Sequence, residues 1–139
     1  MVTTLSGLVG GLLGAAAMTV AATVARDSAW PSAVVWAMYF GDGDPGNYRT
    51  PGLAVHLVYG TLAGAAFAAL VGEPGPATLV DALVLSVGWA VVLAAVAAGF
   101  WLHLLVGAEL DRGALVRMAD VHLAYGAVLG LVVHAFPGL

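Results

Sequence analysis

The sequence predicts an all-α membrane protein with four transmembrane helices and a short interfacial helix in the first loop. Hydrophobic residues make up 62% of the 139 residues and charged residues 9%, whereas roughly a quarter of the residues in an ordinary soluble domain are charged. Four apolar stretches also reach the length of about 20 residues that a helix needs to cross a bilayer. We therefore expect a single domain over residues 1–139. The four stretches span residues 5–25, 53–71, 82–106 and 115–136.

The connections between these stretches differ in character. The first, residues 26–52, contains the apolar and aromatic segment "WPSAVVWAMYF" from Trp30 to Phe40. Pro31 suits the first turn of a helix, and the aromatic residues suit the headgroup region of a bilayer. We therefore expect a short interfacial or re-entrant helix here. The second connection, "GEPGPAT" at residues 72–78, is a tight turn between antiparallel neighbours, because its prolines and glycines break both helices.

The basic residues predict the orientation in the cell membrane. All four are arginines, and none lies near either terminus or in the turn at residues 72–78. Because short loops rich in arginine and lysine stay in the cytoplasm, we expect a multi-pass protein with both arginine-containing loops cytoplasmic and both termini outside. The arginines are Arg26 and Arg49 in residues 26–52, and Arg112 and Arg117 in residues 107–118.

A decapeptide occurs twice. Residues 55–64 read "VHLVYGTLAG" and residues 121–130 read "VHLAYGAVLG", with six of ten positions identical. In each copy, glycines follow the histidine at i+4 and i+8 and therefore share one helix face. Small-residue faces let helices approach closely in lipid, so we expect helix packing at Gly60, Gly64, Gly126 and Gly130. The repetition predicts a tandem repeat of a two-helix unit, although the first and third helices match at no register.

Three histidines are expected at one depth near the cytoplasmic boundary: His56, His103 and His122. In one interpretation, His56 and His122 are the axial ligands of a haem b between two helices. In another, all three bind a transition metal. In the favoured interpretation the three histidines are structural and form hydrogen bonds with backbone or tyrosine groups. A further alternative is that they serve the passage of protons or a solute. The haem interpretation fails if the two glycine faces contact each other, because the helices are then too close.

The composition narrows the function class. The chain has no cysteine, which excludes disulfides, iron–sulfur clusters and thiol nucleophiles. A formal charge of −4 argues against nucleic acid as a partner. Because we find no catalytic nucleophile, phosphate loop or mid-membrane carboxylate, we predict a non-enzymatic structural or accessory subunit in the lipid bilayer, or a small homo-oligomer, with no cofactor established. The alternatives are a small haem-b or metal-binding protein for electron transfer and an oligomeric channel or carrier.

Several features together resemble a known group of proteins. They are the first helix with "GAAAMTVAATVAR" at residues 14–26, the paired "HLxYG" helices, the absence of lysine and the excess of aspartate. In these respects the chain resembles small four-helix membrane proteins of unknown function found in haloarchaea. The resemblance spans the whole chain and implies a membrane location and a salt-rich host. It implies no activity, ligand or catalytic residue.

Overall fold

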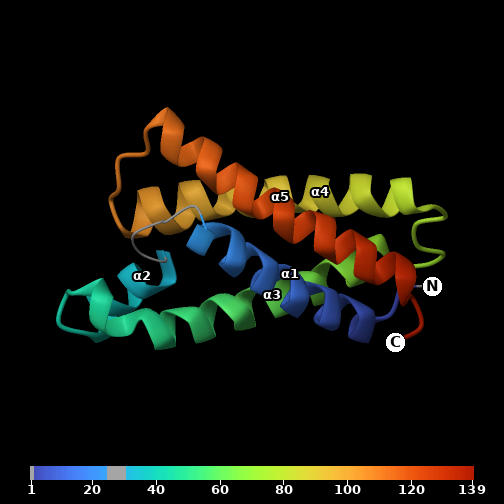
Figure 1. Ribbon diagram of the computed structural model, residues 1–139, viewed down its shortest axis with the longest axis horizontal. Coiled ribbons are helices and arrows are strands. Elements are labelled where there is room, and N and C mark those ends of the chain that lie inside the picture. Colours follow the sequence, from blue (N-terminus) through green and yellow to red (C-terminus); the bar gives the residue numbers. More distant parts are fainter. Residues whose placement is uncertain (1, 25–30) are drawn as a thin grey trace.

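The computed structural model describes residues 2–24 and 31–139, and within these ranges the chain is helical and contains no strand (Figure 1). The predicted all-α class is thereby confirmed. A short apolar helix, α2, is present in the first loop, as expected. The elements are α1 (Thr4–Val24), α2 (Pro31–Phe40), the 3₁₀ turn η1 (Pro45–Tyr48), α3 (Arg49–Val71), α4 (Leu79–Val96), the π-helical segment η2 (Ala97–Leu105) and α5 (Arg112–Ala135).

Four of these helical units are long and apolar enough to cross a membrane: α1, η1 with α3, α4 with η2, and α5. They lie side by side along the long axis of the molecule, with both termini and the α3–α4 turn at one end (Figure 1). We call the opposite end, which carries α2 and the α4–α5 connection, the loop end. Large apolar side chains such as Leu62 and Val84 are exposed on the outer surface, as expected for helices surrounded by lipid.

The helices begin earlier than the apolar stretches. The Asp111 carboxylate accepts a hydrogen bond of 2.6 Å from the backbone N–H of Ala114 and thereby caps α5. Thr78 and Asp81 form a reciprocal capping box at the start of α4. Polar first turns are invisible to a search for apolar residues, so the predicted starts are late. Three residues named in the sequence predictions, Ala25, Arg26 and Trp30, lie outside the described ranges.

Helix α1 lies between α3 and α5, because it carries two rows of glycine. A Cβ atom on Gly7 would lie 2.5 Å from the carbonyl oxygen of Gly64 in α3. A Cβ atom on Gly14 would lie 2.9 Å from the ring of Tyr125 in α5. Both distances are too short for a real side chain, so only glycine permits these approaches. Gly11 belongs to the row that faces α3, and Gly10 to the row that faces α5.

Helix α4 packs closely against α5 and more loosely against α3. A Cβ atom on Gly126 would lie 2.8 Å from the carbonyl oxygen of Ser86 in α4. Between α4 and α3, by contrast, the Trp89 indole N–H donates a hydrogen bond of 3.1 Å to the carbonyl oxygen of Ala63. A large ring therefore spans a gap that glycine closes elsewhere in the bundle.

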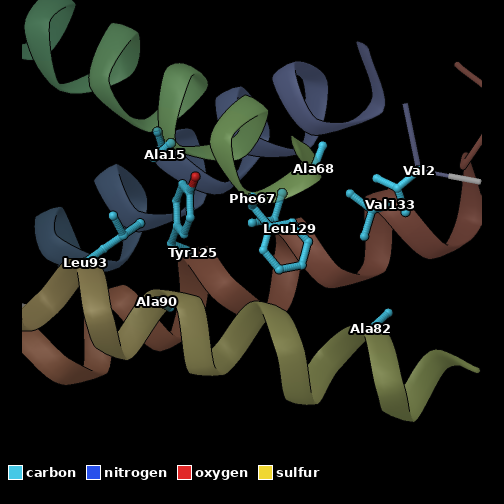
Figure 2. Close-up of a cluster of buried hydrophobic side chains, with 11 residues drawn as sticks. Val2, Ala15, Phe67, Ala68, Ala82, Ala90, Leu93, Tyr125, Leu129 and Val133 are labelled. Atoms are coloured by element: carbon cyan, nitrogen blue, oxygen red, sulfur yellow. The ribbon is translucent and has the colours of Figure 1, made fainter. Parts of the chain in front are cut away.

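The hydrophobic core extends along the bundle from the level of Leu93 and Tyr125 toward the chain termini. Figure 2 shows Tyr125 and Leu93 at one end of the cluster and Val133 and Val2 at the other, with Leu129 between them. Tyr125, Leu129 and Val133 lie at i, i+4 and i+8 on α5 and form the buried stripe of that helix. The bundle is therefore closed at the terminal end.

Candidate ligand cavity

At the loop end the bundle opens into a cavity of about 620 Å³. Ligand sites in proteins have volumes of about 300–1,000 Å³ and are lined mainly by apolar and aromatic side chains, so the size suits a small molecule. Helices α1, α2, α3 and α5 line the cavity, together with the end of α4 and η2. Its larger side chains are Met18, Trp36, Phe40, Tyr59, Leu93, Trp101, Leu102, Met118 and Tyr125.

Tyr125 forms the floor of the cavity. Its side chain is 2% exposed, and its hydroxyl donates a hydrogen bond of 2.7 Å to the carbonyl oxygen of Gly60. Because Tyr125 belongs to α5 and Gly60 to α3, the ring sets the separation of the two helices at this level. The absence of a side chain at Gly14 makes room for the ring. Toward the termini the core is filled, whereas toward the loop end the space between α3 and α5 is open.

His122 lies one helical turn above this floor, lines the cavity and is 6% exposed. Its Nδ1 atom lies 2.8 Å from the carbonyl oxygen of Met118. A carbonyl oxygen can only accept, so Nδ1 carries the proton in this contact. In the neutral ring, Nε2 then holds a lone pair and acts as an acceptor. His122 can therefore offer a lone pair to a metal centre or to a hydroxyl donor.

His56 occupies the matching position on α3. The ring is partly buried, lines the cavity, interacts with the backbone of Ala15 and lies within electrostatic range of His122. Gly52 precedes His56 by four residues, as Met118 precedes His122. The Gly52 carbonyl oxygen accepts a hydrogen bond of 2.7 Å from the Ser32 hydroxyl of α2. The two histidines therefore face one cavity with different surroundings.

Aromatic side chains form one wall, and α2 covers the cavity. Tyr59 and Trp101 contact each other edge to face, with ring centroids 6.2 Å apart. Trp101 belongs to η2, and π-helical segments are frequently found at functional sites. The Tyr39 hydroxyl of α2 donates a hydrogen bond of 3.1 Å to the carbonyl oxygen of Leu105 in η2. Helix α2 is thus tied to α3 through Ser32 and to η2 through Tyr39.

The rim is basic. Among the described residues that line the cavity, Arg49 and Arg117 carry the only charges, when the histidines are counted as neutral. Neither aspartate nor glutamate belongs to this part of the lining. Arginine binds carboxylates and phosphates in a bidentate manner, so two guanidinium groups at the mouth suit an anionic group there.

The structure brings together only part of the predicted histidine group. His56 and His122 share the cavity, whereas His103 is exposed on η2 and does not belong to the lining. Within the described ranges, no group of three or more histidine, cysteine or acidic side chains is arranged to hold a metal ion. His134 is exposed at the terminal end of α5.

The repeated glycines lie on helix contacts, but the two glycine faces do not meet. Gly60 and Gly64 face α1, and Gly126 and Gly130 face α4. The space between α3 and α5 at the histidine level is therefore open, which removes the steric objection to a ligand between them. Neither this cavity nor the position of the arginines at its rim was predicted from the sequence. The sequence feature that could have indicated them is that Arg49 and Arg117 each precede a repeated histidine by two helical turns or less.

The cavity offers three kinds of interaction: a mostly apolar wall, two histidine rings and a basic rim. Together they suit a molecule that is largely apolar and anionic at one end. No protein-family model, curated protein or solved structure matches this chain.

Proposed function

We propose that this protein is a non-enzymatic integral membrane protein that binds an amphipathic small molecule with an anionic group in the loop-end cavity. The observation that carries the proposal is the lining itself. A cavity of about 620 Å³ within a bundle of apolar helices has Arg49 and Arg117 as its only charged described side chains. Such a binding role also suits an accessory subunit of a larger membrane complex.

The proposed orientation places the cavity mouth at the cytoplasmic face. Arg49, Arg112 and Arg117 all belong to segments at the loop end, whereas the termini lie at the opposite end (Figure 1). By the positive-inside rule, the loops at residues 26–52 and 107–118 are cytoplasmic and the termini are outside. A ligand would then enter from the cytoplasm or from the inner leaflet.

We further propose that the chain is a tandem repeat of a two-helix unit, α1 with α3 and α4 with α5. Two parallel contacts support this. Ala15 meets Gly60 in the first pair, and Ala90 meets Gly126 in the second. If Ala15 corresponds to Ala90, then Trp89 corresponds to Gly14. The first unit also contains α2 and η1 between its two long helices, so the spacing from α1 to α3 differs from the spacing from α4 to α5.

The binding proposal is tested with a brominated fatty acid, an anionic amphiphile whose bromine atoms quench tryptophan fluorescence at short range. Trp36 and Trp101 line the cavity, so the protein in nanodiscs of unbrominated lipid should show saturable quenching. Ala97→Phe reduces the cavity volume and should remove the saturable component. Ala95→Phe is the matched control, because Ala95 is exposed two residues before Ala97, at the end of α4.

Two results would contradict the proposal. The first is quenching without saturation in the wild type. The second is an identical saturation curve in Ala97→Phe. The neutral methyl ester of the same brominated acid tests the role of the arginines, and it should bind more weakly than the free acid.

A further inference from the structure

We infer that the ligand of this cavity is a haem b, with His56 and His122 as its two axial ligands and with Arg49 and Arg117 at its propionates. This inference rests on the proposed function, because it names the amphipathic anion that the cavity holds. Four observations carry it: the state of the histidines, the separation of their helices, the aromatic lining and the position of the arginines.

The first observation is the chemical state of the histidine pair. His122 donates from Nδ1 to the carbonyl oxygen of Met118, at 2.8 Å, and keeps its lone pair on Nε2. Histidines that ligate metals usually donate their other ring N–H to a carbonyl or carboxylate in this way, which fixes the tautomer and orients the ring. His56, on a different helix, lines the same cavity within electrostatic range of His122. Two imidazoles from different helices that line one cavity can supply the two axial ligands of a haem iron.

The second observation is the space between the two helices. The Tyr125 ring lies between α3 and α5 and reaches the carbonyl oxygen of Gly60. At this level the helices are therefore separated by a tyrosine side chain rather than in direct contact. The glycines that could have drawn them together face α1 and α4 instead. The open volume begins directly above the ring, at the level of the histidines.

The third observation is the lining around the histidines. Tyr59 and Trp101 form an edge-to-face pair on one side, and Trp36 and Phe40 of α2 also line the cavity. Flat aromatic side chains and aliphatic groups suit an apolar macrocycle, and they exclude water from its faces. Carboxylates, which would repel the propionates, do not occur among the described lining residues.

The fourth observation is the position of the charges. Arg49 precedes His56 by seven residues and Arg117 precedes His122 by five, which corresponds to about 10 Å and about 8 Å along the helix axes. Both arginines thus lie on the loop-end side of their histidine. The two propionates of haem b leave the same edge of the macrocycle. They can therefore both face the loop end, where the guanidinium groups are.

A simple fatty acid or lipid would explain the arginines but not the histidine pair. Such a ligand has one anionic group and no use for two neutral imidazoles inside an apolar cavity. Its affinity should depend on Arg49 and Arg117 and be indifferent to the loss of His56 or His122. This difference separates the two classes of ligand experimentally.

The test is a titration of haemin into the purified full chain in detergent, followed by absorption and electron paramagnetic resonance. The wild type should bind one haemin per chain and give a six-coordinate, low-spin spectrum. His56→Ala and His122→Ala should each lose the low-spin spectrum and most of the affinity. His103→Ala and His134→Ala are the matched controls, since both histidines are exposed outside the cavity lining, and they should leave the spectrum unchanged.

Two additions keep the test decisive if a variant folds poorly. Imidazole added to His56→Gly should restore the low-spin spectrum, which a misfolded chain would not do. The double change of Arg49 and Arg117 to Gln should weaken binding about tenfold or more, as expected for loss of charged hydrogen bonds, while the spectrum at saturation stays low-spin. Circular dichroism verifies the fold of each variant.

The haem inference is overturned if haemin gives no low-spin complex with the wild type, or an identical complex with the double variant His56→Ala/His122→Ala. The brominated fatty acid gives a separate measurement of the proposed function, and a low-spin haemin complex that depends on His56 and His122 would support that function even without saturable quenching. Saturable quenching without a haemin complex would leave the binding function standing and refute haem as the ligand. Failure of both measurements would refute both.

Discussion

The Tyr125 hydroxyl donates a 2.7 Å hydrogen bond to the carbonyl oxygen of Gly60 and joins the two helices that carry the repeated histidines. The bond is buried, with Tyr125 2% exposed. The two partners occupy adjacent positions of the decapeptide, because Tyr125 follows His122 by three positions and Gly60 follows His56 by four. A single contact thereby sets both the floor of the cavity and the distance between its walls.

Tyr125→Phe should lower the free energy of unfolding by about 1 kcal/mol, the typical net value of one hydrogen bond. The ring stays in place, so the loss isolates the hydroxyl. Unfolding in detergent, followed by circular dichroism, measures the change. Tyr39→Phe is the control, because its bond to Leu105 is exposed and should contribute less. If the two variants lose equal stability, the Tyr125 bond has no special role.

Gly60→Leu and Gly126→Leu should each cost on the order of 1–3 kcal/mol through overpacking, but at different interfaces. A side chain at Gly60 meets Ala15 of α1, and one at Gly126 meets Ser86 and Ala90 of α4. Leu62→Ala should cost less, since Leu62 is 60% exposed. Unfolding in detergent gives the free energies, and spin-label distances identify the displaced helix pair. Equal stability in all three variants would show that the glycines are not contacts.

The apolar stretches predict the helices because lipid crossing requires a run of hydrophobic residues, and that requirement is local. The cavity depends on contacts between distant parts of the chain, so no local pattern indicates it. His103 illustrates the limit. If α4 continued as a regular α-helix, His103 would lie at the same depth in the membrane as His56 and His122. However, η2 is wound as a π-helix, with Val106 N–H donating to the carbonyl oxygen of Trp101. This changes the direction of the following side chains, and His103 is exposed.

The glycine rows likewise predict close contacts without saying which helices make them. Under the repeat correspondence, Gly14 of α1 matches Trp89 of α4. Glycine lets α1 approach α5, whereas tryptophan reaches from α4 to the carbonyl oxygen of Ala63 in α3. This pair of positions contributes to the difference in helix spacing, and it lies outside the decapeptides.

The membrane orientation can be tested with introduced cysteines, because the chain has none of its own. Asp44 and Gly113 are exposed at the loop end. Asp44→Cys and Gly113→Cys should be protected from a membrane-impermeant maleimide in intact cells and labelled after the membrane is opened. A reporter fused after Leu139 should give the signal of the outer side. Labelling of both cysteines in intact cells would reverse the orientation, with the bundle unchanged.

Trp89→Ala should destabilise the protein and reduce the capacity of the cavity. The indole is half-buried and donates a hydrogen bond of 3.1 Å to Ala63, so we expect a loss of about 2–4 kcal/mol, near the lower end of the range for aromatic truncations in cores. Without the Trp89 ring, α4 should move toward α3, because this movement partly fills the space that the ring occupied and so reduces the free-energy cost of the cavity left behind. Spin labels on exposed Leu62 and Val92 should then report a shorter distance, and the brominated fatty acid should saturate at a lower level. Phe136→Ala removes an exposed aromatic ring near the terminal end and should change neither the distance nor the saturation level. An unchanged α3–α4 distance in Trp89→Ala would show that Trp89 does not set the separation of these helices.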